Sequence, residues 1–132
     1  MTTNEKAVKA KLSQAFEGFA GVRCYYEKAP KNAAFPYIVV KGLHTSPLNA
    51  GDVITFTVEL YTEETAAGAS DELEALRDKV RNGADGALLT DNENFYGHIN
   101  FDGSDDGGLD AEYDLAHRQM FFSLRLLYFQ GE

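Results

Sequence analysis

A run near the end of the chain, residues 117–130, constrains the fold more than any other part of the sequence. Apolar residues stand at every second position and would share one face of an extended strand: Met120, Phe122, Leu124, Leu126 and Tyr128. The other face would be half apolar, with Phe121, Ser123, Arg125, Leu127 and Phe129. So long and apolar a strand is expected in the centre of a sheet or under a second subunit.

Composition limits the class of protein. The 132 residues are 44% hydrophobic, which is enough for one ordinary core, so a single domain over residues 1–132 is expected. The net charge of −9 argues against a sequence-specific nucleic-acid binder, which needs clustered Lys and Arg. No apolar run approaches the roughly twenty residues that span a bilayer, so no membrane association is expected.

The N-terminal residues and the cysteine content favour a cytoplasmic origin. Residues 1–11 are polar and lack the apolar region of a secretory signal. Cys24 is the one cysteine, so it cannot form an internal disulfide, and it fits a reducing compartment. Its place in an expected strand indicates a buried or half-buried thiol rather than a nucleophile.

Periodicity predicts an α+β fold. Helical spacing of apolar residues covers residues 3–18, ending near Gly18 and Gly21, and residues 63–82, with Gly83 as the stop. Strands are expected over 22–27, 35–41, 52–61, 95–101 and 117–130, and residues 43–51 are expected to be a hairpin connection. Together these elements predict a mainly antiparallel sheet of four to five strands with two helices packed on one face.

The segment 102–114 is predicted to be an acidic loop. Its carboxylates are Asp102, Asp105, Asp106, Asp110, Glu112 and Asp114, and its glycines favour a flexible, solvated turn. Part of it imitates a calcium loop, but Tyr113 stands where the bidentate glutamate belongs. The three histidines and the serines form no recognisable catalytic or metal-binding spacing, so no catalytic residue, metal or cofactor is predicted.

Aromatic residues are the stronger functional signal. The chain has nine Phe and seven Tyr and no Trp. Several should lie on exposed strand faces, and an exposed apolar face usually marks an interface. The candidate interface residues are Tyr37, Tyr61, Phe121, Arg125 and Phe129. The alternative is that a loop folds over this face.

The order of these segments resembles a known family. An N-terminal helix, the Phe-Pro-Tyr-Ile-Val-Val strand at 35–40, the alternating strand at 52–61 and a helix at 67–81 are followed by an acidic lead into the strand at 117–128. This pattern is similar to that of the tail terminator or tail-completion proteins of long-tailed phages and prophages, also called minor tail or minor capsid proteins.

The resemblance implies a non-enzymatic role in virion assembly. Such proteins form a ring, commonly a hexamer, that caps the head-proximal end of the tail tube, stops its growth and meets the neck. The implied partners are further copies of the chain, the major tail tube protein and a neck or head-completion protein. The implied location is the tail of the virion, after assembly in the bacterial host cytoplasm. The alternatives are another head–tail connector, such as a stopper or adaptor, and a small cellular α+β enzyme or ligand-binding domain.

Overall fold

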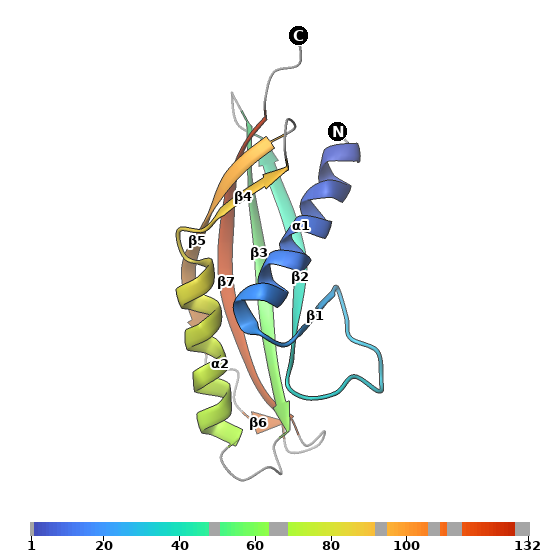
Figure 1. The fold of residues 1–132 in the computed structure, drawn as a ribbon, viewed down its shortest axis with the longest axis vertical. Helices are drawn as coiled ribbons and strands as arrows, with labels where there is room; N and C mark the ends of the chain where they lie inside the picture. The colour runs from blue at the N-terminus through green and yellow to red at the C-terminus, as the bar shows by residue number, and fades with distance from the viewer. Residues whose placement is uncertain are drawn as a thin grey trace.

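The computed structural model describes residues 2–47, 51–63, 69–91, 95–105, 109–110 and 115–128. Two helices and seven strands follow one another along the chain (Figure 1). Their bounds are α1 Thr2–Ala20, β1 Arg23–Tyr26, β2 Tyr37–Pro47, β3 Gly51–Glu63, α2 Ala69–Ala84, β4 Leu88–Asp91, β5 Phe95–Asp105, β6 Leu109–Asp110 and β7 Leu115–Tyr128.

The strands form one mainly antiparallel, curled sheet. Six of them lie in the order β1-β2-β3-β7-β5-β4, and β6, which is not part of this path, pairs with β7. Only the β1–β2 pair is parallel among these described pairs. The predicted α+β class with two helices is therefore confirmed. The prediction of four to five strands was too low, because β4 and β6 are too short to show a period.

Strand β7 lies in the middle of the sheet. It pairs along its length with β3, from Leu115 opposite Glu63 to Leu127 opposite Gly51. On its other side it pairs with β5, from Gln119 opposite Asp105 to Tyr128 opposite Phe95. The central position expected from the alternating apolar residues is confirmed, because both edges of this strand have partners.

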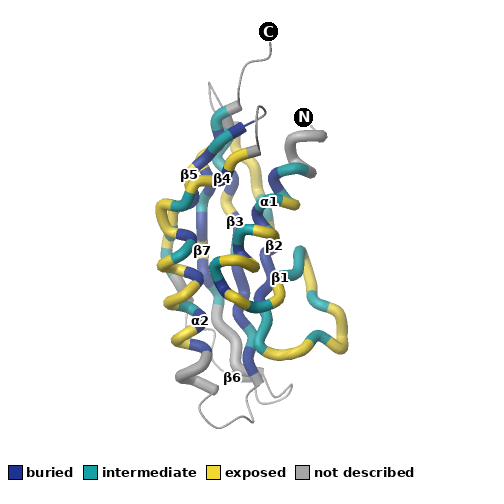
Figure 2. The backbone as a smooth tube through the Cα atoms, in the orientation of Figure 1, coloured by how far each residue is buried: buried dark blue, intermediate teal, exposed yellow. Residues whose placement is uncertain are grey.

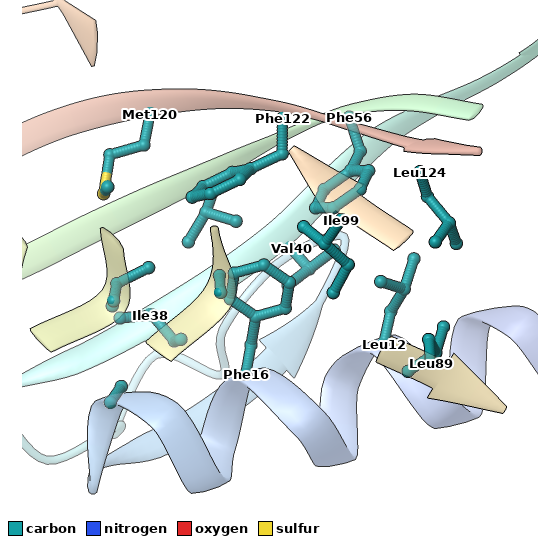
Figure 3. Close-up of a cluster of buried hydrophobic side chains, with 14 of the residues drawn as sticks. Leu12, Phe16, Ile38, Val40, Phe56, Leu89, Ile99, Met120, Phe122 and Leu124 are labelled. Carbon is teal, nitrogen blue, oxygen red and sulfur yellow. The ribbon is translucent and has the colours of Figure 1, made fainter. Parts of the chain in front are cut away.

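Both helices lie on the same face of the sheet, and the core fills the space between (Figure 1, Figure 2). Phe16 of α1 stands at its centre, with ring centroids 5.6 Å from Phe56 of β3 and 5.2 Å from Phe122 of β7 (Figure 3). These rings meet edge to face, a favourable arrangement for aromatic pairs. The largest fully buried side chains are Phe16, Phe95, Phe122, Leu12, Ile38, Leu60, Ile99, Met120, Leu124, Leu126, Val8 and Val40.

Several strands are longer than the sequence predicted. The expected hairpin connection over 43–51 is wrong for residues 43–47, because β2 continues to Pro47. A register shift between Lys41 and His44 accommodates an extra residue, and Gly42 there has φ of 69°. The strand begins at Tyr37, directly after Pro36, as expected for a residue that cannot donate to the ladder.

One predicted glycine ends its helix and another does not. At the end of α1, Gly21 has φ of 69° and its N–H donates to the Glu17 carbonyl, so it caps the helix as expected. Gly83 is not a stop, because α2 continues through it to Ala84. A Cβ on Gly83 would lie 2.8 Å from the Cβ of Phe19, so the glycine allows α2 to approach α1 closely.

Candidate functional site

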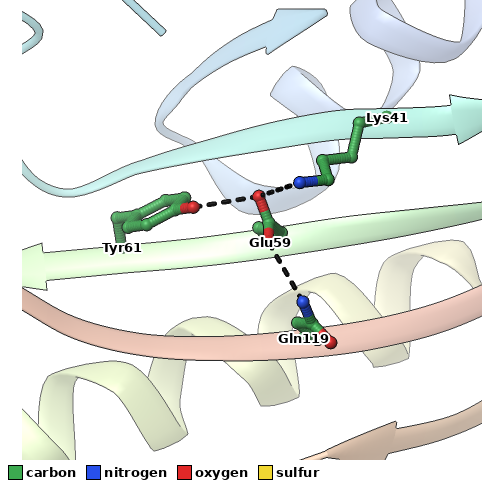
Figure 4. A network of polar contacts seen from close by, with 4 residues as sticks. All are labelled: Lys41, Glu59, Tyr61 and Gln119. Atoms are coloured by element: carbon green, nitrogen blue, oxygen red, sulfur yellow. Dashed lines mark hydrogen bonds and ion pairs between the residues drawn. The ribbon is translucent and has the colours of Figure 1, made fainter. Parts of the chain in front are cut away.

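The sheet face that points away from the helices is the candidate site, called here the open face. Alternation along β2, β3 and β7 sends one set of side chains into the core and the other set to this face. Figure 4 shows part of it, with both helices behind the strands. Its described side chains in these strands include Tyr37, Val39, Lys41, Val53, Thr57, Glu59, Tyr61, Gln119, Phe121, Ser123 and Arg125.

Aromatic rings gather at one end of the open face. Tyr37 and Tyr61 are opposite one another in register, and their rings stack with centroids 5.0 Å apart. Phe35 and Tyr25 also contact Tyr37, at centroid distances of 5.3 and 5.7 Å. The two predicted interface residues Tyr37 and Tyr61 are thus brought together, and Phe35 keeps 38% of its surface exposed.

Two of the other predicted interface residues lie farther along β7, and the third lies outside the described residues. Phe121 is opposite Thr57 and is 38% exposed, although it lies in a central strand. Arg125 is exposed near the other end of the sheet, opposite Val53 of β3 and His98 of β5. Phe129 lies outside the described residues. The open face therefore combines exposed apolar rings with a separate cationic side chain.

A buried carboxylate lies beside the aromatic rings. Glu59 is only 5% exposed, although no described helix covers this face. Its Oε1 accepts a hydrogen bond from the Tyr61 hydroxyl at 2.9 Å and lies 3.1 Å from the Lys41 Nζ (Figure 4). Its Oε2 accepts a hydrogen bond from Gln119 Nε2 at 3.1 Å. Three strands thus supply donors to one carboxylate, which offsets the loss of its hydration.

The network also holds the tyrosines in their protonated form. Burial, followed by the hydrogen bond to Glu59, raises the pKa of Tyr61. Burial also raises the pKa of Tyr37, with smaller contributions from Tyr25 and the Glu59 charge. At neutral pH the Tyr61 hydroxyl is therefore a donor that fixes the ring stacked on Tyr37.

Sequence reasoning missed Glu59 and Gln119. The alternation of residues 52–61 places Glu59 on the less apolar face of the strand, where a carboxylate is expected to be exposed to solvent. Its burial depends on Lys41 and Gln119, which are 18 and 60 positions away along the chain. The one local signal was Tyr61 two residues on, the spacing at which side chains share a strand face.

The predicted acidic loop is largely replaced by strands. Asp102 and Asp105 lie in β5, which extends to Asp105, and Asp110 lies in β6. Because 103–105 and 109–110 pair in the sheet, a loop over all of 102–114 is wrong. Asp106, Glu112 and Asp114 lie outside the described residues. Within the described part of the chain, no three His, Cys, Asp or Glu side chains gather as a metal site.

Cys24 is a partly buried thiol, as predicted. Burial, followed by the nearby Glu17 carboxylate, raises its pKa to about 12, so it stays protonated and is a poor nucleophile at neutral pH. Among the described residues, neither helix is long and apolar enough to cross a membrane.

Comparison with known proteins points to a single family. The family model described as "Tail completion protein gp17" matches residues 6–127, which is most of the chain. Eight chains of solved structures match. One belongs to the "Virion of native gene transfer agent (GTA) particle"; it is 16% identical, the match covers 90% of this chain and 93% of that chain, and the TM-score is 0.67. At this identity the likeness concerns the fold alone. The comparison with curated proteins gives no match.

Proposed function

We propose, because the chain belongs to the family of tail completion protein gp17, that it is a structural protein that caps the head-proximal end of a phage tail tube. In this role it forms a ring on the finished tube, ends tube polymerisation and offers a joining surface to the neck. The chain acts as one domain over residues 1–132. Its place is the tail of the virion, after assembly in the host cytoplasm, and it performs no catalysis.

The open face is the observation that supports this proposal best. A sheet face with stacked tyrosines and a 38% exposed phenylalanine fits a protein surface that becomes buried on assembly. The Glu59 network holds Tyr61, whose ring stacks on Tyr37, so less conformational entropy is lost at these two side chains on contact. Tyr37, Tyr61, Phe121 and Arg125, with Phe129, are the proposed contact residues.

The proposed partners are other proteins of the virion. A ring, with six copies as the expected number, requires contacts between different surfaces of neighbouring copies. The ring also meets the major tail tube protein on one side and a neck or head-completion protein on the other. The fold shared with a chain from a gene transfer agent virion is in keeping with such a place.

Replacing Phe121 with glutamate tests the role of the open face. Phe121 is partly exposed in the free chain, so Phe121→Glu should leave the fold intact, whereas burying a charge in a contact should prevent ring formation and tube capping. The measurements are circular dichroism for the fold and electron microscopy of tail tubes, whose lengths become uncontrolled when capping fails. Ala10→Glu, an equal charge change on an exposed site of α1, is the matched control.

Three outcomes would contradict the proposal in different ways. Unfolding of the free chain by Phe121→Glu would show that this side chain belongs to the core. Normal capping by the folded variant would remove Phe121 from the contact. A wild-type chain that binds neck proteins but never tube ends would instead indicate a stopper or adaptor.

A further inference from the structure

The charges of this chain are separated between the two edges of the sheet. Residues 21–47 comprise β1, β2 and their connection, and carry four basic residues and one acidic residue. Residues 69–105 comprise α2, β4, β5 and the segments between them, and carry nine acidic and three basic residues. The first segment has a formal charge of +3 and the second of −6, within a chain of net charge −9.

The topology places these segments on opposite sides of the molecule. In the order β1-β2-β3-β7-β5-β4, the basic segment forms one edge and β5 and β4 form the other. Figure 1 shows the connection between β1 and β2 standing out at one side, and α2 with β5 at the opposite side. We name the first side the basic edge, residues 21–47, and the second the acidic edge, residues 69–91 and 95–105.

On the basic edge, three of the four cations are exposed, and the fourth, Lys41, pairs with Glu59. Lys28 and Lys31 are exposed on the projecting connection, and Arg23 is exposed on β1. The outward N–H of Cys24 in β1 already donates to the Glu17 carboxylate at 3.0 Å. Because this N–H is already used, a further strand cannot hydrogen-bond to it. A contact at this point is therefore made by side chains.

On the acidic edge, several charged side chains take part in contacts within the chain, and several carboxylates remain exposed. Asp85 accepts a hydrogen bond from the Phe101 N–H at 3.0 Å, and Arg81 lies over the Phe101 ring at 4.8 Å. Glu74, Asp78 and Asp102 are exposed, and Asp78 meets Arg77 at 3.4 Å. The exposed carboxylates of α2 and β5 give this edge the charge that complements Lys28 and Lys31.

We propose that neighbouring copies of the chain meet with the basic edge of one against the acidic edge of the next. This inference rests on the proposed ring and names its contact. Two different surfaces then meet, and repetition of such a contact closes a ring. Contacts between like edges place like charges together and are disfavoured, so the charges also set the direction in which copies join.

A charge exchange between two variants tests this contact. One variant carries Lys28→Glu and Lys31→Glu, and the other carries Glu74→Lys and Asp78→Lys. Each alone should associate at least about tenfold more weakly than the wild type, because its two changed side chains meet side chains of the same sign on the neighbouring copy. An equimolar mixture should regain association, since the introduced glutamates at positions 28 and 31 meet the introduced lysines at positions 74 and 78, and the two native edges attract one another as before. Mixed rings should alternate the variants.

Lys11→Glu in α1, outside both edges, is the control and is compared with Lys28→Glu alone. It makes the same single charge change on a partly exposed residue. It should therefore leave association unchanged. The readouts are sedimentation velocity over a range of concentrations and electron microscopy of capped tubes. Circular dichroism verifies that every variant folds. Wild-type association should weaken between about 0.05 and 0.5 M NaCl, as expected for charges screened by salt.

The results separate this inference from the proposed function. Rings formed equally by the wild type and the Lys28→Glu, Lys31→Glu variant overturn the edge contact and leave the capping role in place. Failure of the mixture to recover, when both variants are folded, also overturns it. A wild-type chain that neither associates nor caps tubes overturns the proposed function and the edge contact together.

Discussion

At the scale of single residues, Glu59 should stabilise the chain far more than its surface position suggests. Glu59→Ala removes the common acceptor of Tyr61, Lys41 and Gln119 and leaves part-buried donors unpaired. We expect it to lower the free energy of unfolding by about 2–3 kcal/mol, measured by urea denaturation. Tyr61→Phe should have a smaller effect of about 1 kcal/mol, because Glu59 keeps its other two donors. A Glu59→Ala effect below about 0.5 kcal/mol would be typical of a solvated carboxylate and would contradict this role.

Alkaline pH should weaken the fold through Cys24 and Tyr61. The pKa of Cys24 rises from 9.0 to about 12, mainly by burial, so the folded chain keeps a proton that the unfolded chain loses. The pKa of Tyr61 is raised from its ordinary 10.0 in the same direction. Because the folded state binds more protons, stability should be fully present below pH 9 and fall as the pH rises from there.

Unfolding at several pH values measures this effect. Cys24→Ala should flatten the loss that begins near pH 9, and Tyr61→Phe the part above pH 10. Stability that is constant from pH 8 to pH 11 would show that neither group is desolvated as the structure indicates.

At the scale of elements, two helical glycines should respond to alanine in opposite directions. A Cβ on Gly83 would lie 2.8 Å from Phe19 Cβ, which cannot rotate away, so α2 would have to move from α1. The strain should exceed the gain in helix propensity, giving a net loss of about 1–2 kcal/mol for Gly83→Ala. At Gly18 of α1 nothing lies within 4 Å, and Gly18→Ala should stabilise by about 0.5–1 kcal/mol. Thermal unfolding of both variants measures the difference; stabilisation by both would mean that the helices are not in close contact at Gly83.

The sequence predicts those helices and strands that are long enough for their apolar side chains to repeat in a visible pattern. The alternation of 52–61 and 117–130 predicted β3 and β7, and the position of β7 followed from its second apolar face. Strand β4 has four residues and β6 has two, which is too short for a period. Residues 43–47 contain turn-forming residues, and only the bulge at Gly42 allows them to continue β2. At the site, the aromatic residues were visible in sequence, whereas the Glu59 network needed the register of three strands.

At the scale of the whole molecule, salt should act on folding and on association in opposite directions. The net charge of −9 produces self-repulsion in the compact state, which salt screens. Raising NaCl from about 0.02 to 0.5 M should therefore stabilise the free chain by about 1 kcal/mol, or about 3 °C in Tm. The edge-to-edge contact should weaken over the same range. Calorimetry at low protein concentration separates the two effects. A lower Tm in salt would show that attractive pairs such as Lys41–Glu59 outweigh the repulsion.

The position of β7 also bears on when the chain can fold during its synthesis. Among the described strands it is the last to leave the ribosome, yet it separates β3 from β5 and pairs with both. Until it emerges, the two halves of the sheet have no common partner and the core lacks Met120, Phe122, Leu124 and Leu126. A product of interrupted translation that ends before β7 therefore cannot build either the sheet or its open face. Such a fragment should therefore be unable to join a ring, so assembly is expected to take up only subunits that have been synthesised through β7.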